Sequence, residues 1–128
     1  MLVVHADMPA DEGDWSRMIV VRNANRSKIR STLVIAQPRS TLSAAQRAEV
    51  AQFMNSTGTS VAVVTDSALI RGVARAVGFL GVNVRAFSSG QVIEALQFSL
   101  VPQARHADML RRIDAMRAQL GAPIRPSP

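Results

Sequence analysis

The residues with the clearest chemical potential lie where a short apolar run ends and a helical pattern begins. Ser40, Thr41 and Ser43 bring three hydroxyl groups into the stretch PRSTLSAAQ, directly after Arg39. Ser43 stands three residues before Gln46, which is the spacing of a capping box at a helix start. The same hydroxyls can carry a phosphate, which would lie over a helix N-terminus and add about two negative charges. A helix cap and a phosphorylation site are therefore the two interpretations of this stretch.

A second polar group follows the apolar run 61–64, where Asp66 and Ser67 come directly after Thr65. Open α/β sheets tend to bind ligands at the carboxyl ends of their strands, and Arg71 follows closely in the sequence. These residues can contact a small ligand or a lipid head group, or Asp66 and Ser67 can simply cap the next helix. Asp66 has no neighbouring His or Lys for an acid-base pair, and Ser67 lies in no nucleophile-elbow motif.

No pattern in the sequence indicates catalysis. Neither a Gly-x-Gly-x-x-Gly loop nor a Walker sequence occurs, which disfavours an NTPase or a dinucleotide enzyme. The chain has no cysteine, and His5 and His106 are its only histidines, so no metal-ligand spacing is recognisable. His5 is either a surface residue or the edge of a site. We expect a protein that is not an enzyme and that uses no cofactor or metal.

The basic residues do not form a nucleic-acid-binding pattern, although the formal net charge is +6. They cluster in 22–30 and 105–125, and clustered cations gain from neutralising phosphates. Neither cluster has interleaved aromatic residues, and no helix-turn-helix or zinc-finger spacing accompanies them. A solvated basic surface is the simpler interpretation, and nucleic acid is not an expected partner.

Short apolar runs alternate with helical patterns along residues 1–100. Runs within 1–5, 31–37 and 60–64 and the alternating stretch 82–87 predict strands, the last near a sheet edge. Helices are expected between them, from Pro9 to about Asn25 with Trp15 as a core anchor, and after Ser43, Ser67 and Ser88. A strand over 18–21 is the alternative in the first of these helices. The order predicts an α/β fold with a mostly parallel central sheet of about four strands.

A C-terminal amphipathic helix is expected to follow Pro102. Met109, Ile113, Met116 and Leu120 are spaced four, three and four residues apart, which is typical of a coiled-coil seam or of a helix docked on a neighbour. The seam either packs on the parent sheet or forms a homodimer or partner contact. We divide the chain into an α/β domain over 1–100, this helix over 101–121 and a disordered proline-rich tail over 122–128.

The length and hydropathy of the chain predict one domain in the cytoplasm. The 128 residues are 48% hydrophobic, which suffices for one substantial core. No apolar run approaches the ~18 residues of a membrane span, and the acidic start MLVVHADMPADEG does not resemble a signal peptide.

The order and register of residues 31–98 resemble the STAS superfamily, the sulfate-transporter and anti-sigma-factor-antagonist domains, and its bacterial single-domain antagonists in particular. The segments STLVIAQ, PRSTLSAAQ, SVAVVTDS, VNVRAF and SSGQVIEAL follow one another as a strand, an acceptor loop, a strand, a further strand and a last helix do in that family. The family's acceptor loop usually reads Asp-Ser-Ser or Thr-Gly-Leu, whereas this chain has Ser40-Thr41-Leu42-Ser43.

The resemblance implies a non-enzymatic bacterial regulatory module that docks a protein partner through residues 38–54. Its phosphoacceptor would be Ser43, Thr41 or Ser40. Its interaction surface would include Arg39, Gln46, Arg47 and Val50. A small-ligand or lipid-head-binding domain at Asp66, Ser67 and Arg71, or a self-assembling subunit, is the alternative.

Overall fold

The computed structural model describes residues 1–5, 7–79 and 81–119. Its elements in chain order are β1 (Leu2–Val4), α1 (Glu12–Ala24), β2 (Ser31–Ile35), α2 (Ala44–Thr57), β3 (Ser60–Val64), α3 (Ala68–Gly78), β4 (Val84–Phe87), the 3-10 turn η1 (Ser89–Gln91), α4 (Val92–Phe98), the 3-10 turn η2 (Gln103–Arg105) and α5 (His106–Gln119). The α/β class and the C-terminal helix predicted from the sequence are confirmed.

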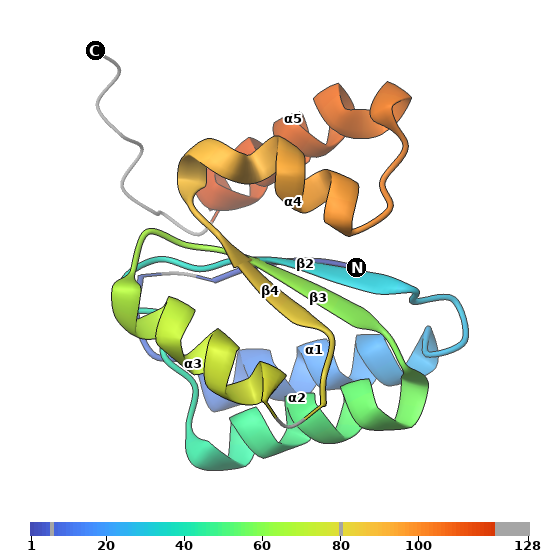
Figure 1. Ribbon diagram of the computed structural model, residues 1–128. Helices are drawn as coiled ribbons and strands as arrows, with labels where there is room; N and C mark the ends of the chain where they lie inside the picture. The colour runs from blue at the N-terminus through green and yellow to red at the C-terminus, as the bar shows by residue number, and fades with distance from the viewer. Residues whose placement is uncertain (6, 80, 120–128) are drawn as a thin grey trace.

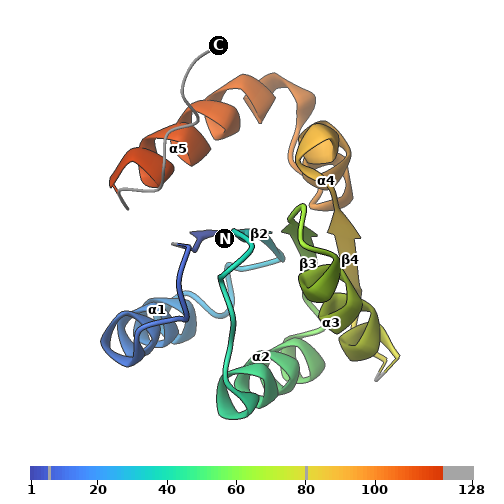
Figure 2. The same cartoon turned by 90° about the vertical axis from the view of Figure 1, so that its left-hand side faces the viewer.

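The four strands form one sheet in the order β1-β2-β3-β4, and every neighbouring pair is parallel. In register, Leu33 of β2 lies opposite Leu2 of β1 and Ala62 of β3. Each strand lies beside the one before it, always in the same direction across the sheet. Because such crossovers are right-handed, the helices that connect the strands share one face of the sheet. Figures 1 and 2 show α1, α2 and α3 on that face, with α4 and α5 over the other.

The face under α4 and α5 carries the main hydrophobic core. Because side chains alternate along a strand, Leu33, Ile35, Ala62 and Val64 all point to this face. They pack with Phe87 of β4 and with residues of the two helices, namely Ala95, Leu96 and Ile113. Leu33, Ile35, Ala62 and Val64 are each at most 2% exposed, so this layer is closed to solvent.

The seam of α5 belongs to this core. Ile113 is 4% exposed within it, and Met109 and Met116 pack against it. Packing on the parent sheet, one of the two predicted roles for the seam, is thus seen for these three residues, with Met109 and Met116 partly buried. The homodimer or partner contact stays a prediction. Leu120 and the tail 122–128, which were predicted to complete the seam and to be disordered, lie outside the described residues.

The opposite face, under α1, α2 and α3, is packed more loosely. Its cluster of fully buried apolar residues consists of Met54, Val61 and Val82, with Val34 and Val63 partly buried against them. Gly72 in α3 does not lie at a close-packed position. The residue is exposed, and a Cβ atom added there would meet no other atom within 4 Å.

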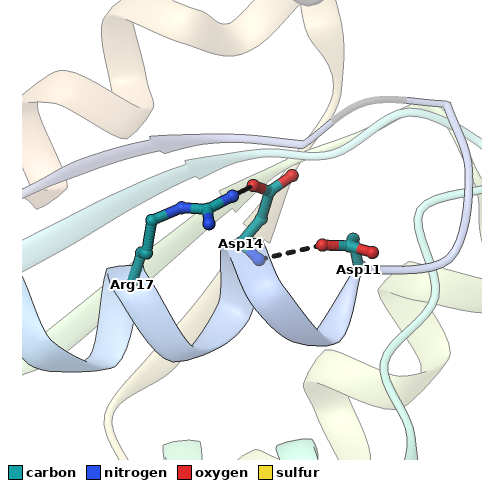
Figure 3. Close-up of polar contacts among 3 residues, drawn as sticks. All are labelled: Asp11, Asp14 and Arg17. Carbon is teal, nitrogen blue, oxygen red and sulfur yellow. Dashed lines mark hydrogen bonds and ion pairs between the residues drawn. The ribbon is translucent and has the colours of Figure 1, made fainter.

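A polar side chain caps the start of the first helix. The carboxylate of Asp11 caps α1 by accepting a hydrogen bond from the backbone N–H of Asp14, whose own carboxylate pairs with Arg17 (Figure 3). This helix begins at Glu12 rather than at Pro9, and it covers 18–21, so the alternative of a strand there is wrong. At the C-terminal end of α2, Gly58 adopts a left-handed φ of 68° that favours glycine.

Candidate functional site

The carboxyl ends of the parallel strands meet at one edge of the sheet, where the predicted ligand contacts lie. Asp66 accepts a hydrogen bond of 2.9 Å at Oδ1 from the backbone N–H of Ser89, which ties the end of β3 to the start of η1. Ser67 caps α3 by accepting from the N–H of Ile70 at 3.3 Å, and Arg71 reaches back to the carbonyl of Thr65 at 3.4 Å. All three polar side chains therefore hold loops together at this edge.

The loop 37–43 between β2 and α2, here called the entry loop, is held from several sides. The N–H of Arg39 donates to Asp7 Oδ1 at 2.8 Å, and the carbonyl of Thr41 accepts from the N–H of Ala10 at 3.2 Å. Within the loop, Ser40 Oγ accepts from the N–H of Gln37 at 2.9 Å. These contacts fix the loop against the segment between β1 and α1, so it presents a defined surface.

The three hydroxyls of the entry loop have different environments. Ser40 is 8% exposed and its side chain is used inside the loop, so it is not accessible to a kinase. Ser43 is exposed, but its Oγ accepts from the N–H of Gln46 at 3.1 Å while Gln46 Oε1 accepts from the N–H of Ser43 at 2.9 Å. The predicted capping box is confirmed. Thr41 is exposed and takes no part in the cap.

The predicted interaction surface divides into exposed and buried residues. The Arg39 side chain is 81% exposed, and Arg47 is exposed with one guanidinium nitrogen on the carbonyl of Leu42 at 2.7 Å. Gln46 is only 4% exposed, and its amide donates to Glu12 Oε1 at 3.2 Å. Val50 is half-buried and packs on the cluster under α2. Gln46 lies on the buried face of α2 and Val50 is half-buried there, so Arg39 and Arg47 are the exposed members of the predicted interaction surface. We call Arg39, Thr41, Ser43 and Arg47 the entry surface.

An apolar cavity of about 340 Å³ lies between the sheet and helices α1, α2 and α3. The sheet contributes Val3, Val34 and Val63, and the helices contribute Met18, Val50 and Val73. Leu69, which is 69% exposed, also lines it, so the cavity reaches the surface beside α3. Ser40, Thr41 and Leu42 line it too, so the back of the entry loop forms part of its wall.

A cavity of this size is energetically significant. Empty apolar space inside a protein costs roughly 24 cal/mol per Å³, and 340 Å³ would then correspond to about 8 kcal/mol for a closed, empty space. The opening beside α3 makes this an upper bound, since water can enter. The figure is comparable with the whole stability of a small domain, about 5–15 kcal/mol, so an apolar molecule that fills the space would stabilise the fold.

Arg22, in the last turn of α1, is the most unusual residue of the cavity wall. It is only 7% exposed, and its guanidinium lies over the ring of Phe53 at 4.1 Å from the ring centre. Its Nε is buried without a hydrogen-bond partner among the described residues. The nearby carboxylate of Glu49 accepts instead from the indole N–H of Trp15, at 2.7 Å. Burial lowers the pKa of Arg22, and the negative charge of Glu49 works in the opposite direction.

His5 lines the same cavity from the end of β1, near the carboxyl edge of the sheet. Its burial lowers its pKa, because the charged imidazolium is poorly solvated there. The imidazole is therefore neutral at pH 7. Of the two predicted positions for His5, a surface residue or the edge of a site, its place in the cavity wall agrees with the second.

The sequence reasoning missed the cavity. The sequence signal for the cavity lies in the helical pattern of α1. After Met18 and Ile19, the spacing allows either Val21 or Arg22 to occupy the next inward position. In the structure Val21 is 58% exposed and Arg22 is buried. A charged residue at an inward helix position was the available hint. Trp15, predicted as a core anchor, is buried at 6% exposure.

Two searches within the described part of the chain gave negative results. Over residues 1–5, 7–79 and 81–119 no group of three or more His, Cys, Asp or Glu side chains is placed to hold a metal ion. In the same residues no helix has the length and apolar character needed to cross a membrane.

Comparison with known proteins did not assign the chain to a family. No protein-family model, no curated protein and no solved structure matches it.

Proposed function

We propose that this chain is a non-enzymatic regulatory module of the bacterial cytoplasm that binds a protein partner through the entry surface. The observation that carries the proposal is the exposure of Thr41 and Ser43 on a loop fixed by hydrogen bonds to Asp7 and Ala10. Arg39, whose Nε lies 3.8 Å from Asp7 Oδ2, and Arg47 flank them, so the surface is polar and keeps a net positive charge before modification. A fixed, exposed loop suits recognition because little ordering entropy is lost when a partner binds.

The resemblance of residues 31–98 to STAS domains supports the same proposal, since it aligns PRSTLSAAQ with the loop that carries a phosphoacceptor in that family. Thr41 is the better acceptor in this chain, because Ser43 Oγ is engaged in the capping box. A phosphate on Thr41 would lie near the N-terminus of α2 and between two guanidinium groups, all of which favour negative charge. It would change the sign of the local surface charge and thereby the affinity for the partner.

The two alternatives have less support. A ligand site at Asp66, Ser67 and Arg71 would compete with the loop contacts that these side chains already make. Self-assembly through the α5 seam would compete with the packing of Ile113 on the sheet.

The proposal is tested by quantitative affinity capture from a lysate of cells that naturally express the chain. The wild type is compared with Thr41→Asp and with a matched control, Ser27→Asp, which places the same charge at an exposed position after α1, at the opposite edge of the sheet. Circular dichroism establishes that all three proteins are folded.

We expect one protein to be captured by the wild type and by Ser27→Asp, and to be gained or lost by several-fold with Thr41→Asp. Capture of the same proteins in the same amounts by all three would refute the proposal.

A further inference from the structure

The cavity under α1, α2 and α3 combines a mostly apolar wall with one buried, incompletely bonded cation. Valines of the sheet face methionine, valine and leucine side chains of the helices across 340 Å³, a volume in the lower part of the range of small-molecule pockets, about 300–1,000 Å³. Such a space favours a hydrocarbon or aromatic body over a polar one. It lies behind the entry surface, and Thr41 and Arg47 of that surface form part of its wall.

The charged end of the cavity is defined by Arg22. A buried guanidinium normally has hydrogen-bonding partners for its N–H groups, because an unpaired buried charge is strongly unfavourable. Here the ring of Phe53 covers one face of the guanidinium, while Nε has no partner among the described residues. The carboxylate of Glu49 does not approach within ion-pair distance and is occupied by Trp15. Arg22 therefore lines the cavity as a buried cation with no ion-pair partner among the described residues.

The local charge balance selects a monoanion. Arg26 also lies on the ring of Phe53, at 5.6 Å from its centre, but it is exposed and donates to Ser56, so Arg22 is the buried guanidinium of the pair. One negative charge neutralises it. A doubly charged phosphate would exceed this balance and would lose more hydration on entering an apolar space.

We propose that the cavity binds a small apolar carboxylic acid, with its carboxylate on Arg22 and its hydrocarbon body against Val34 and Val63 of the sheet. The carboxylate accepts hydrogen bonds from the terminal N–H groups of the guanidinium. The body displaces water from the apolar wall, and the opening beside Leu69 provides the entry path.

The test uses octanoate, octan-1-ol and octylamine with the full chain, followed by isothermal titration calorimetry and thermal unfolding. We expect octanoate to bind and to raise the melting temperature. Octan-1-ol, which has the same chain without the charge, should bind about tenfold or more weakly, the size expected for one lost charge-assisted hydrogen bond. Octylamine should not bind, because its positive charge faces Arg22.

Two variants locate the head group. Arg22→Gln should weaken octanoate about tenfold or more and leave octan-1-ol unchanged. Arg17→Gln removes an exposed guanidinium from the same helix and should change neither affinity.

A measurement on the wild type alone keeps the proposal testable even if Arg22→Gln does not fold. Methyl resonances of Val34 and Val63 should shift on adding octanoate, while those of Leu96 and Val92 on the opposite face of the sheet should not. Equal affinities for octanoate and octan-1-ol, absence of octanoate binding, or shifts confined to Leu96 and Val92 would each overturn the proposal.

Discussion

The packing of α5 on the sheet predicts that truncating Ile113 is costly. Ile113 is 4% exposed and lies in the cluster with Leu33, Ile35 and Leu96. Ile113→Ala removes three carbon atoms, about 2.4 kcal/mol of transfer free energy at about 0.8 kcal/mol per methylene group. The cavity left behind adds to this, so we expect a loss of about 3–4 kcal/mol, within the range of about 2–5 kcal/mol for such changes. The melting temperature should fall by on the order of 10 °C.

The assay is urea unfolding followed by circular dichroism, with Leu110→Ala as the matched control. Leu110 lies on the same helix, loses the same three carbons and is 36% exposed, so its truncation should cost under about 1 kcal/mol. The slope of free energy against urea should be unchanged in both variants, since the surface exposed on unfolding stays nearly the same. Equal losses for the two variants would refute the packing of α5. A fall in oligomer mass with no change in unfolding free energy would indicate that Ile113 contacts a second copy instead.

Three further predictions concern other parts of the chain. Gly72→Ala should raise the free energy of unfolding by about 0.5–1 kcal/mol, because the position is helical, exposed and has open space around it. Gly58→Ala should lower the free energy of unfolding, because φ at Gly58 is 68°. Urea unfolding measures both changes, and stabilisation by both would contradict the helix boundaries. Ser43→Ala should lower the free energy of unfolding by about 1 kcal/mol through loss of the capping box, while Thr41→Ala should leave it nearly unchanged. A larger loss for Thr41→Ala than for Ser43→Ala in the same assay would contradict Ser43 as the cap of α2. Burial lowers the pKa of His5 below its ordinary value of 6.5, so the unfolded chain binds the proton more readily and stability should fall as the pH drops below about 6.5. His5→Gln should reduce that pH dependence, and an identical dependence in the variant would show that His5 does not cause it.

Much of the fold was predictable because its signals are local. The run LVIA and the run VAVV are too short for helices and end at residues that start the next helix, so strand, cap and helix follow in order. The spacing of Ser43 and Gln46 predicted a capping box that the structure has. Alternation of strands and helices then leaves few topologies other than a parallel sheet.

The functional features were less predictable because they depend on how helices lie on the sheet. Gln46 and Val50 are near exposed residues in sequence, yet the orientation of α2 buries Gln46 and half-buries Val50. The cavity depends on the distance between two layers, and no residue pattern records that distance. Arg22 was consistent with either an inward or an outward position, and only the structure places it on Phe53.

The central claim is that a protein partner binds the entry surface, and hydrogen exchange on the purified complex tests it most directly. We predict that backbone amides of residues 37–47 exchange more slowly in the complex than in the free chain, and that those of α5 do not change. Protection confined to α5, with residues 37–47 exchanging as in the free chain, would contradict the account.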